Sequence, residues 1–330
     1  MNSSKPAIFD VREVSKYIPI RKGLFSRKVG EWKILNGISF SLNKGDIMGC
    51  VGESGSGKSV LLDCLLRMTP VSAGDIYYNG QNLRSLNDEQ SLRRFRREVQ
   101  LIFQDPVGSL HPRMNIETIL TEPLAIHNVG TPRERKERAR ELLPLVGLDA
   151  DMIHRYPHQF SGGQRQRIGI ARALALNPGV ILADEPVSAL DVSLAAQVLN
   201  LFLDLQEQFD LTYFIVAHDM AVLRQLCNKV AIIYAGRFVE TGLNQEIYSS
   251  PQHPYTRALL ASSPSIKRSL SEQEVMVPRG ESPDPARLPA GCPFHPRCDF
   301  AIRECSVEPP PLKQISPTHS VLCHVFPDKG

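Results

Sequence analysis

Residues 52–59, Gly52-Glu-Ser-Gly-Ser-Gly57-Lys58-Ser59, constrain the fold of this chain more than any other segment. They match the pattern G-x-x-x-x-G-K-[ST], which binds phosphate when it joins a β-strand to an α-helix. Both neighbours are indicated here, because an apolar run (47–51) precedes the motif and a helical pattern (60–68) follows it. The chain is therefore predicted to contain a sheet with a glycine-rich loop at the end of one strand.

The residue types of this loop suit a nucleoside triphosphate. Glycines let the backbone curve closely enough for successive N–H groups to face phosphate oxygens, and the helix N-terminus adds its dipole. Lys58 supplies a cation for the β and γ phosphates, and Ser59 would ligate Mg²⁺. A glycine-rich turn that binds nothing is the alternative, which the flanking strand and helix argue against. The candidate ATP-binding residues are Gly52, Glu53, Ser54, Gly55, Ser56, Gly57, Lys58 and Ser59.

The length and charge of the chain limit what surrounds the loop. With 330 residues and 42% hydrophobic content, the chain can bury the core of one large α/β domain plus an appendage. Its 38 basic and 35 acidic residues give a formal net charge of only +3, which leaves no strong positive field for nucleic acid. We find neither the apolar stretch of a signal peptide nor an apolar run near the roughly 18 residues of a spanning helix. A cytosolic or peripheral membrane protein is expected, with no nucleic-acid partner.

The first half of the chain indicates strands followed by helices. Short β-type runs dominate residues 8–51, with a polar insertion near residues 21–28. A helical pattern follows from 107 to 160. Its clearest helix begins with the capping box of Thr131 and Glu134 and ends near Gly147.

The second half indicates a parallel sheet. Apolar strands at 180–183 and 211–217 alternate with helical stretches, which is typical of βαβ units and a doubly wound core. A hairpin is predicted over 230–241. After about residue 280 a proline-rich composition indicates a small irregular module.

Two adjacent carboxylates, Asp184 and Glu185, follow the strand at 180–183, at the edge of the sheet where ligands usually bind. Asp184 would hold Mg²⁺ through its water shell, and Glu185 would polarise the attacking water. A strand followed by Asp-Glu is a weak signal alone, since many loops begin in this way. Its place about 130 residues after the phosphate loop favours a function.

The segment Phe160-Ser161-Gly162-Gly163-Gln164-Arg-Gln-Arg closely resembles the signature sequence of ABC proteins. Ser161 and Gln164 form a Ser-x-x-Gln capping box that opens a helix predicted to reach Leu176. The two glycines leave the positive end of this helix open, and such an end binds a terminal phosphate. A merely well-capped helix is the alternative.

The resemblance implies a P-loop NTPase of the ABC type. Such a cassette has an antiparallel β subdomain, a RecA-like parallel-sheet core and a helical subdomain that carries the signature. Two cassettes sandwich two nucleotides in this family, so the signature would face ATP on the other subunit. Gln104 matches the Q-loop glutamine and would join Ser59 and Asp184 at Mg²⁺, while Asp191 matches the D-loop aspartate at the dimer seam.

The resemblance also implies a switch histidine and an adenine-stacking aromatic residue. His218, at the end of the strand 211–217, matches the histidine that contacts the γ-phosphate and acts with Glu185. Tyr17 is our choice for the aromatic residue, although the polar insertion leaves Phe25 or Trp32 as alternatives.

Within ABC proteins, the chain resembles the oligopeptide, dipeptide and nickel importers over essentially its whole length. The resemblance is carried by the sequences of residues 52–57, 103–113, 183–191 and 253–256. This resemblance implies an ATPase on the cytoplasmic face of the bacterial inner membrane. Its expected partners are a related, non-identical ATPase subunit, two transmembrane permease subunits and an extracytoplasmic solute-binding protein.

The expected organisation is a cassette over 1–260, with its helical subdomain at about 107–165, and a C-terminal extension over 261–330. A soluble ABC ATPase acting on nucleic acid or ribosomes is the rival hypothesis. Its known forms carry two cassettes or long insertions, whereas about 110 residues separate the phosphate loop from the signature here. A module that binds ATP without turnover is a second rival, against which the intact Glu185 and His218 argue.

Four of the seven cysteines crowd into the proline-rich end of the chain, which has few apolar residues for a core. Four thiolates suit Zn²⁺ or an iron–sulfur cluster, and similar patterns in the resembling importers are linked to a [4Fe-4S] cluster. Reduced thiols or labile disulfides are the other alternative, and His295 and His324 lie nearby in the sequence. The candidate ligands are Cys292, Cys298, Cys305 and Cys323.

Overall fold

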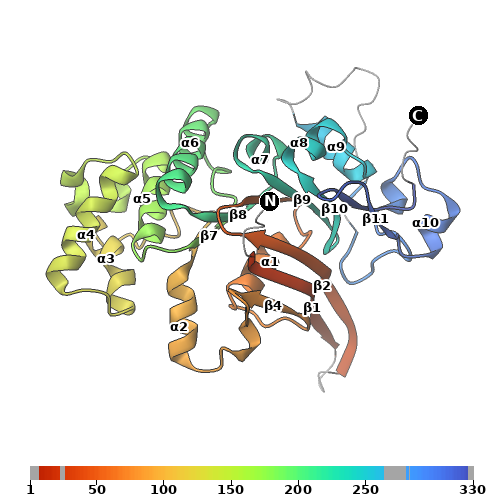
Figure 1. Cartoon of the computed structure of the whole chain (residues 1–330), viewed down its shortest axis with the longest axis horizontal. Helices are drawn as coiled ribbons and strands as arrows, with labels where there is room; N and C mark the ends of the chain where they lie inside the picture. The colour runs from red at the N-terminus through yellow and green to blue at the C-terminus, as the bar shows by residue number, and fades with distance from the viewer. Residues whose placement is uncertain (1–6, 23–26, 264–279, 282, 326–330) are drawn as a thin grey trace, which may run out of the picture. The chain divides into compact units, whose positions relative to one another are not determined.

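The computed structural model describes residues 7–22, 27–263, 280–281 and 283–325 of the chain. The chain divides into two compact units. Unit 1 comprises residues 1–43, 48–84 and 217–330, and unit 2 comprises residues 44–47 and 85–216. Each unit combines strands with helices, so the predicted α/β class is confirmed (Figure 1).

The first sheet of unit 1 is antiparallel and has the strand order β2-β1-β4-β5. Its strands are β1 (Ala7–Lys22), β2 (Arg27–Asn43), β4 (Ala73–Tyr78) and β5 (Gln81–Asn82). The strand-rich opening predicted from the sequence is therefore confirmed. The pairing of β1 with β2 continues to Lys22 and Arg27, on either side of residues 23–26.

A second group of strands in unit 1 has the order β11-β12-β10-β9-β3. Strand β3 (Ile47–Val51) is parallel to β9 (Lys229–Tyr234), and the other pairs are antiparallel. The remaining strands are β10 (Arg237–Leu243), β11 (Leu312–Gln314) and β12 (Ser320–Leu322). The predicted hairpin is confirmed as β9–β10, and its turn uses the positive φ angles of Ala235 (46°) and Gly236 (75°).

The helices of unit 1 are short. They are α1 (Lys58–Leu65), α7 (Met220–Leu226), α8 (Asn244–Ser249), α9 (Pro254–Ser262), α10 (Arg303–Val307) and a 3₁₀ turn, η5 (His295–Arg297). Helix α1 ends before Met68, the predicted limit. Arg67 has a left-handed φ of 52°, and the N–H of Met68 returns 2.8 Å to the carbonyl of Asp63, which closes the helix.

Unit 2 has three parallel strands in the order β8-β7-β6, which confirms the predicted βαβ pattern. They are β6 (Val99–Ile102), β7 (Val180–Asp184) and β8 (Thr212–Ala217, whose last residue belongs to unit 1). The helices are α2 (Glu89–Glu98), α3 (Ile116–Ile126), α4 (Pro132–Leu145), α5 (Gly162–Leu174) and α6 (Val192–Phe209), with 3₁₀ turns at η1 (Leu83–Ser85, whose first two residues belong to unit 1), η2 (Ala150–His154) and η3 (Pro157–Gln159).

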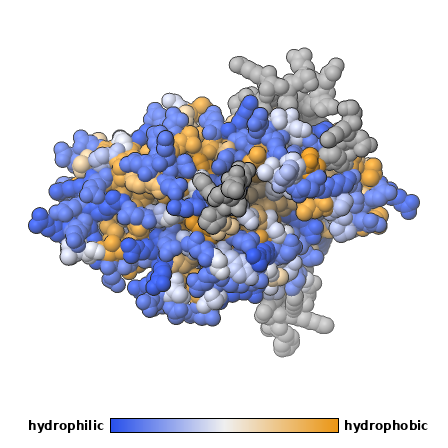
Figure 2. All heavy atoms as spheres, in the orientation of Figure 1, coloured by the Kyte–Doolittle hydropathy of each residue, from blue (hydrophilic) through white to orange (hydrophobic). Residues whose placement is uncertain are grey.

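Helices α3, α4 and α5 lie together in unit 2 (Figure 1). Helix α4 begins with the predicted capping box, in which Thr131 and Glu134 bond each other's backbone N–H groups, and Gly147 follows it with a φ of 70°. Hydrophilic residues cover most of the visible face, with hydrophobic areas between them (Figure 2). Among the described helices, none is both long and apolar enough to cross a bilayer.

Candidate functional site

The phosphate loop of unit 1 connects β3, whose five residues are all buried, to helix α1. Glycine is required at two of its positions. A Cβ on Gly52 would lie 2.2 Å from the carbonyl oxygen of Ile233, and one on Gly57 would lie 2.7 Å from that of Ile34. Gly57 also has a φ of 106°, so packing and backbone geometry together fix the loop.

The ammonium of Lys58 lies inside the loop. Its Nζ donates to the carbonyl oxygens of Gly52 (2.6 Å) and Glu53 (3.0 Å), and the residue is only 6% exposed. A buried cation is costly unless it is well paired. The loop therefore pairs its buried positive charge with two of its own carbonyl oxygens, and the same charge would attract a phosphate bound in the loop.

Ser56 and Ser59 add hydroxyl groups to the loop. Ser56 is buried, and within the described part of the chain its Oγ has no hydrogen-bond partner. Ser59, the second residue of α1, is exposed. An unpartnered buried hydroxyl and a helix N-terminus both favour a polar ligand at the loop, and an exposed serine suits the metal-ligand role predicted for Ser59.

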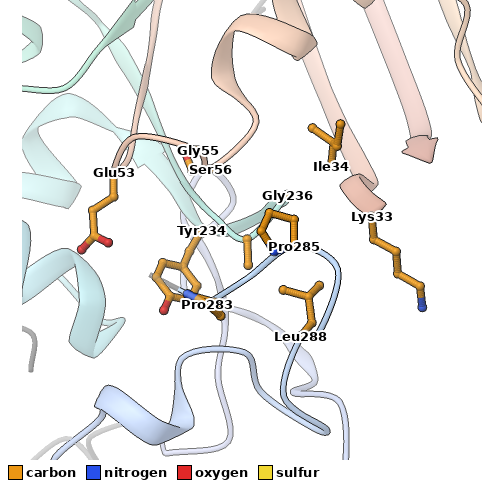
Figure 3. Close-up of a pocket in the computed structure, with 11 residues that line it drawn as sticks. Lys33, Ile34, Glu53, Gly55, Ser56, Tyr234, Gly236, Pro283, Pro285 and Leu288 are labelled. Carbon is orange, nitrogen blue, oxygen red and sulfur yellow. The ribbon is translucent and has the colours of Figure 1, made fainter. Parts of the chain in front are cut away.

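A pocket lies beside the phosphate loop (Figure 3). Its wall is formed by Lys33, Ile34, Glu53, Gly55, Ser56, Tyr234, Ala235, Gly236, Pro283, Pro285 and Leu288. Tyr17 on β1 pairs directly with Lys33 on β2, so both side chains lie on one face of the sheet, whereas Trp32 points to the other. Phe25, the third aromatic candidate, lies outside the described residues. The register thus favours Tyr17 near the loop.

Unit 2 brings two of the predicted catalytic residues together. Gln104 follows β6, Glu185 follows β7, and these strands are neighbours in register. The Nε2 of Gln104 donates to Oε2 of Glu185 over 3.0 Å. The amide therefore fixes one carboxylate oxygen of Glu185, although the two residues lie 81 positions apart.

The backbone of Glu185 is also constrained. Its φ of 44° is left-handed, which is uncommon for a residue other than glycine and occurs often at functional sites. The N–H of Glu185 donates to Val216 O (2.9 Å), and its carbonyl accepts from the hydroxyl of Ser188 (3.0 Å). Asp184, the last residue of β7, is partly buried beside it.

The signature segment is the exposed start of helix α5. Ser161 and Gln164 form the predicted capping box, with the Ser161 Oγ accepting from the Gln164 N–H (3.3 Å) and the Gln164 Oε1 accepting from the Ser161 N–H (3.0 Å). Gly163 is buried, and a Cβ there would come within 3.2 Å of Leu194. The first turn is thus open to solvent only at Ser161 and Gly162, with Gln164 partly exposed.

Asp191 and His218 occupy the ends of other elements. Asp191 caps helix α6 by accepting from the N–H of Leu194 (2.9 Å), so its side chain has a structural task beside the predicted D-loop role. His218 belongs to unit 1, directly after β8, and is exposed. That His218 acts together with Glu185 of unit 2 remains a prediction.

Three residues that our sequence reasoning missed hold the back of the phosphate loop. Arg297 forms two hydrogen bonds to the carboxylate of Glu53 (2.9 and 3.0 Å), and the hydroxyl of Tyr255 accepts from the Glu53 N–H (2.8 Å). Tyr234 bonds Arg297 in turn (3.2 Å). No local pattern connects positions 53 and 297, which are 244 residues apart, so the sequence carried no signal for this contact.

The four C-terminal cysteines are free thiols in one region of unit 1. Burial, reinforced by the neighbouring thiols, raises the pKa of Cys292 to about 11 and that of Cys323 to about 12. A metal ligand must be the thiolate. Across the described residues, no three His, Cys, Asp or Glu side chains are arranged to hold a metal ion. His295 and His324 each bond a backbone carbonyl instead. The described residues therefore give no support to the predicted metal or cluster, which stays a prediction.

Sequence families match two parts of the chain. The family described as "ABC transporter" matches residues 35–188, and the one described as "Oligopeptide/dipeptide transporter, C-terminal region" matches residues 239–305. The oligopeptide transport ATP-binding protein AppF of Bacillus subtilis is 48% identical over 98% of this chain and 99% of its own. The dipeptide transport ATP-binding protein DppF of Haemophilus influenzae is 44% identical over 94% of each chain.

Solved structures share the fold. The dimeric ATP-binding cassette MJ0796, in a post-hydrolysis state with ADP and Pi, has a TM-score of 0.63 and 27% identity, covering 72% of this chain and 98% of its own. CbiO1 of Clostridium perfringens, part of the ABC transporter complex cbiONQ, has the same TM-score at 22% identity, covering 74% and 92%.

Proposed function

This chain belongs to the family of ABC transporter ATP-binding proteins of the oligopeptide and dipeptide importers, and we propose from its site how it works as the ATP-hydrolysing subunit of such an importer. It has the ABC cassette fold, with an antiparallel and a parallel sheet. ATP is its substrate, Mg²⁺ its cofactor, and permease subunits and a second ATPase its partners. Its relatives' names do not favour the soluble, nucleic-acid alternative.

The hydrogen bond between Gln104 and Glu185 is the observation that carries the proposed hydrolytic mechanism. A carboxylate that takes a proton from water acts most effectively when it is held in a fixed orientation towards that water. Gln104 fixes Oε2 over 3.0 Å. Glu185 therefore orients and deprotonates the attacking water. Through its hydrogen bond, Gln104 couples movements of the segment that follows it to Glu185.

Other residues bind and orient the nucleotide. Ser59, Gln104 and Asp184 would hold Mg²⁺, which would supply positive charge to the phosphate oxygens. Lys58 binds the β and γ phosphates, residues 52–57 cradle them with backbone N–H groups, and Tyr17 stacks on adenine. His218 contacts the γ-phosphate. Each assignment rests on residue type, motif position and the local geometry of its own unit.

Dimerisation completes each site. The exposed first turn of α5 presents Ser161, Gly162 and the positive end of a helix, which suits the γ-phosphate of ATP bound by a partner cassette. Asp191 lies at the start of α6, beside this turn, as a D-loop residue would. The dimeric state of MJ0796 supports this arrangement. We infer that the partner is a related, non-identical ATPase.

Further parts of the proposal concern organisation and place. The cassette spans 1–260, with its helical subdomain at about 107–165, and the extension spans 261–330. The subunit lies on the cytoplasmic face of the bacterial inner membrane, where an extracytoplasmic binding protein delivers the solute to the permeases. The [4Fe-4S] cluster or Zn²⁺ predicted for the C-terminal cysteines has no support from their described arrangement, and no step uses it. Elemental analysis of the anaerobically purified chain tests that prediction independently.

Reconstitution tests the function directly. The chain is co-expressed with candidate permeases and a second ATPase, and vanadate-sensitive ATP hydrolysis is measured with and without binding protein loaded with di- to pentapeptides. We expect stimulation by loaded binding protein that the Glu185→Gln variant abolishes. Association with no permease, or stimulation by nucleic acid instead, would refute the importer assignment.

A further inference from the structure

The residue Glu53 is held from three directions. Its N–H donates to the hydroxyl of Tyr255 (2.8 Å), and its carboxylate accepts two hydrogen bonds from Arg297 (2.9 and 3.0 Å). Its carbonyl oxygen accepts from the Lys58 Nζ (3.0 Å) and from the Ser56 N–H (3.2 Å). In Figure 3 the carboxylate points away from Lys33 and Ile34, on the other side of the loop.

The Arg297–Glu53 pair is bidentate and largely shielded from water. The side chain of Arg297 is 9% exposed and that of Glu53 is 26% exposed. Two parallel N–H···O bonds fix the orientation of a carboxylate as well as its position. Screening by salt is weak for such a pair, so it holds the loop more firmly than a surface ion pair does.

Aromatic rings fix Arg297 itself. Its guanidinium carbon lies 5.8 Å from the ring centre of Tyr234 and 5.9 Å from that of Phe294, and Nη1 donates to the Tyr234 hydroxyl (3.2 Å). The rings of Tyr234, Tyr255 and Phe294 pack against one another with centroids 4.6 to 5.4 Å apart. A guanidinium between packed rings has little freedom to leave.

A short chain of contacts therefore links the C-terminal segment to the cation of the phosphate loop. It runs from Arg297 through the carboxylate of Glu53 to the Glu53 carbonyl, which bonds both Lys58 and Ser56. If the carboxylate were released, that carbonyl would lose one of the contacts that set its direction. Lys58 and the backbone N–H of Ser56 would then meet phosphate in a less defined geometry.

We propose that Arg297 is a positioning residue for ATP binding, which sets the phosphate loop through Glu53 from outside the nucleotide site. The C-terminal segment is thereby a working part of the nucleotide site. This inference rests on the proposed function, because it assigns Arg297 to the same loop. It predicts a loss of ATP affinity rather than of turnover, since the contacts of Arg297 lead through Glu53 to the phosphate-binding loop.

Binding of N-methylanthraniloyl-ATP to the purified full-length chain tests the proposal by fluorescence titration. We expect Arg297→Gln to weaken binding about tenfold, the effect of about 1.4 kcal/mol. Arg297→Lys keeps the charge but not the fork, so it should recover part of the affinity. Arg303→Gln, at an exposed arginine of the same segment, is the matched control and should bind like the wild type.

A second measurement separates positioning from general damage. In the reconstituted complex, the KM for ATP should rise in Arg297→Gln while kcat stays within about twofold. Adding Glu53→Gln to Arg297→Gln should cost little further affinity, because both substitutions remove the same contact. Circular dichroism shows whether each variant is folded. If Arg297→Gln is unfolded, the test uses Arg297→Lys instead.

Wild-type affinity in folded Arg297→Gln would overturn the inference, as would an equal loss in Arg303→Gln or a fall in kcat at unchanged KM. The proposed function fails in a different way, because the wild-type chain would then associate with no permease, or respond to nucleic acid, whatever its affinity for nucleotide.

Discussion

Substitutions of Ser161, the signature serine, can separate an effect on stability from an effect on ATP hydrolysis. Its single hydroxyl has both a structural and a proposed catalytic role. It caps α5 by accepting from the Gln164 N–H over 3.3 Å, and in the proposed dimer it meets the γ-phosphate of the partner's ATP. Alanine removes both tasks. Asparagine and aspartate keep the cap, since both are as good at this position as serine, but aspartate adds a negative charge.

The structure sets the expected magnitudes. Ser161→Ala should lower the free energy of unfolding by about 1 kcal/mol, the usual value of a lost N-cap. Loss of a hydrogen bond to a charged phosphate is worth about 1.5–3 kcal/mol, so ATP turnover should fall about 10- to 150-fold. Ser161→Asn should retain stability with partial activity. Ser161→Asp should retain stability and lose turnover, because its carboxylate would face another anion.

Two assays measure this series: urea unfolding of the purified chain, and ATP hydrolysis by the reconstituted complex. The matched control is Thr131→Asp, which makes the same exchange in the capping box of α4, away from the motifs. It should leave turnover unchanged. Wild-type turnover in Ser161→Asp would refute the reasoning, since the hydroxyl would then not face a phosphate.

Three further predictions use the same preparations. Glu185→Gln keeps a partner for Gln104 but cannot take a proton, so kcat should fall about 10²- to 10⁴-fold with the affinity for ATP unchanged; a normal kcat would place the base elsewhere. Tyr17→Ala should weaken nucleotide binding by about 1 kcal/mol through lost stacking, whereas Trp32→Ala should not, and the reverse result would exchange their roles. Burial lowers the pKa of His253 to about 4 from 6.5, so below pH 6.5 the unfolded chain binds a proton that the folded chain does not. The free energy of unfolding should then drop by up to about 1.4 kcal/mol per pH unit between pH 6.5 and 4. His253→Asn retains an acceptor for the Tyr255 N–H and should reduce that slope in urea titrations; an unchanged slope would show that other groups cause it.

Local chemistry explains which parts of the fold were predictable. The capping boxes at Thr131 and Ser161 and the β9–β10 turn depend on residues within a few positions of one another, and each was predicted at its observed place. The position at which helix α1 ends was not predicted correctly. Leu66 and Met68 continue the apolar pattern, but Arg67 takes a left-handed conformation that stops the helix, and periodicity does not report backbone conformation.

Long-range contacts explain what the sequence left open. The motifs indicated the residue types of the site, and strand neighbours β6 and β7 bring Gln104 to Glu185 as the pattern required. The support of Glu53 by Arg297 depends instead on the folding of a proline-rich segment that has no periodicity.

The pairing of β3 with β9 has a consequence for how the chain is made. Residues 47–51 leave the ribosome long before their neighbours at 229–234, and at 5–20 residues per second the delay is roughly 10 to 40 s. The strands β6, β7 and β8 are synthesised together within that interval. This apolar segment thus waits on the nascent chain without its β9 neighbour, which makes it a natural client for chaperones. A message cut before codon 229 would encode every residue of the phosphate loop and still lack the strand that pairs with β3.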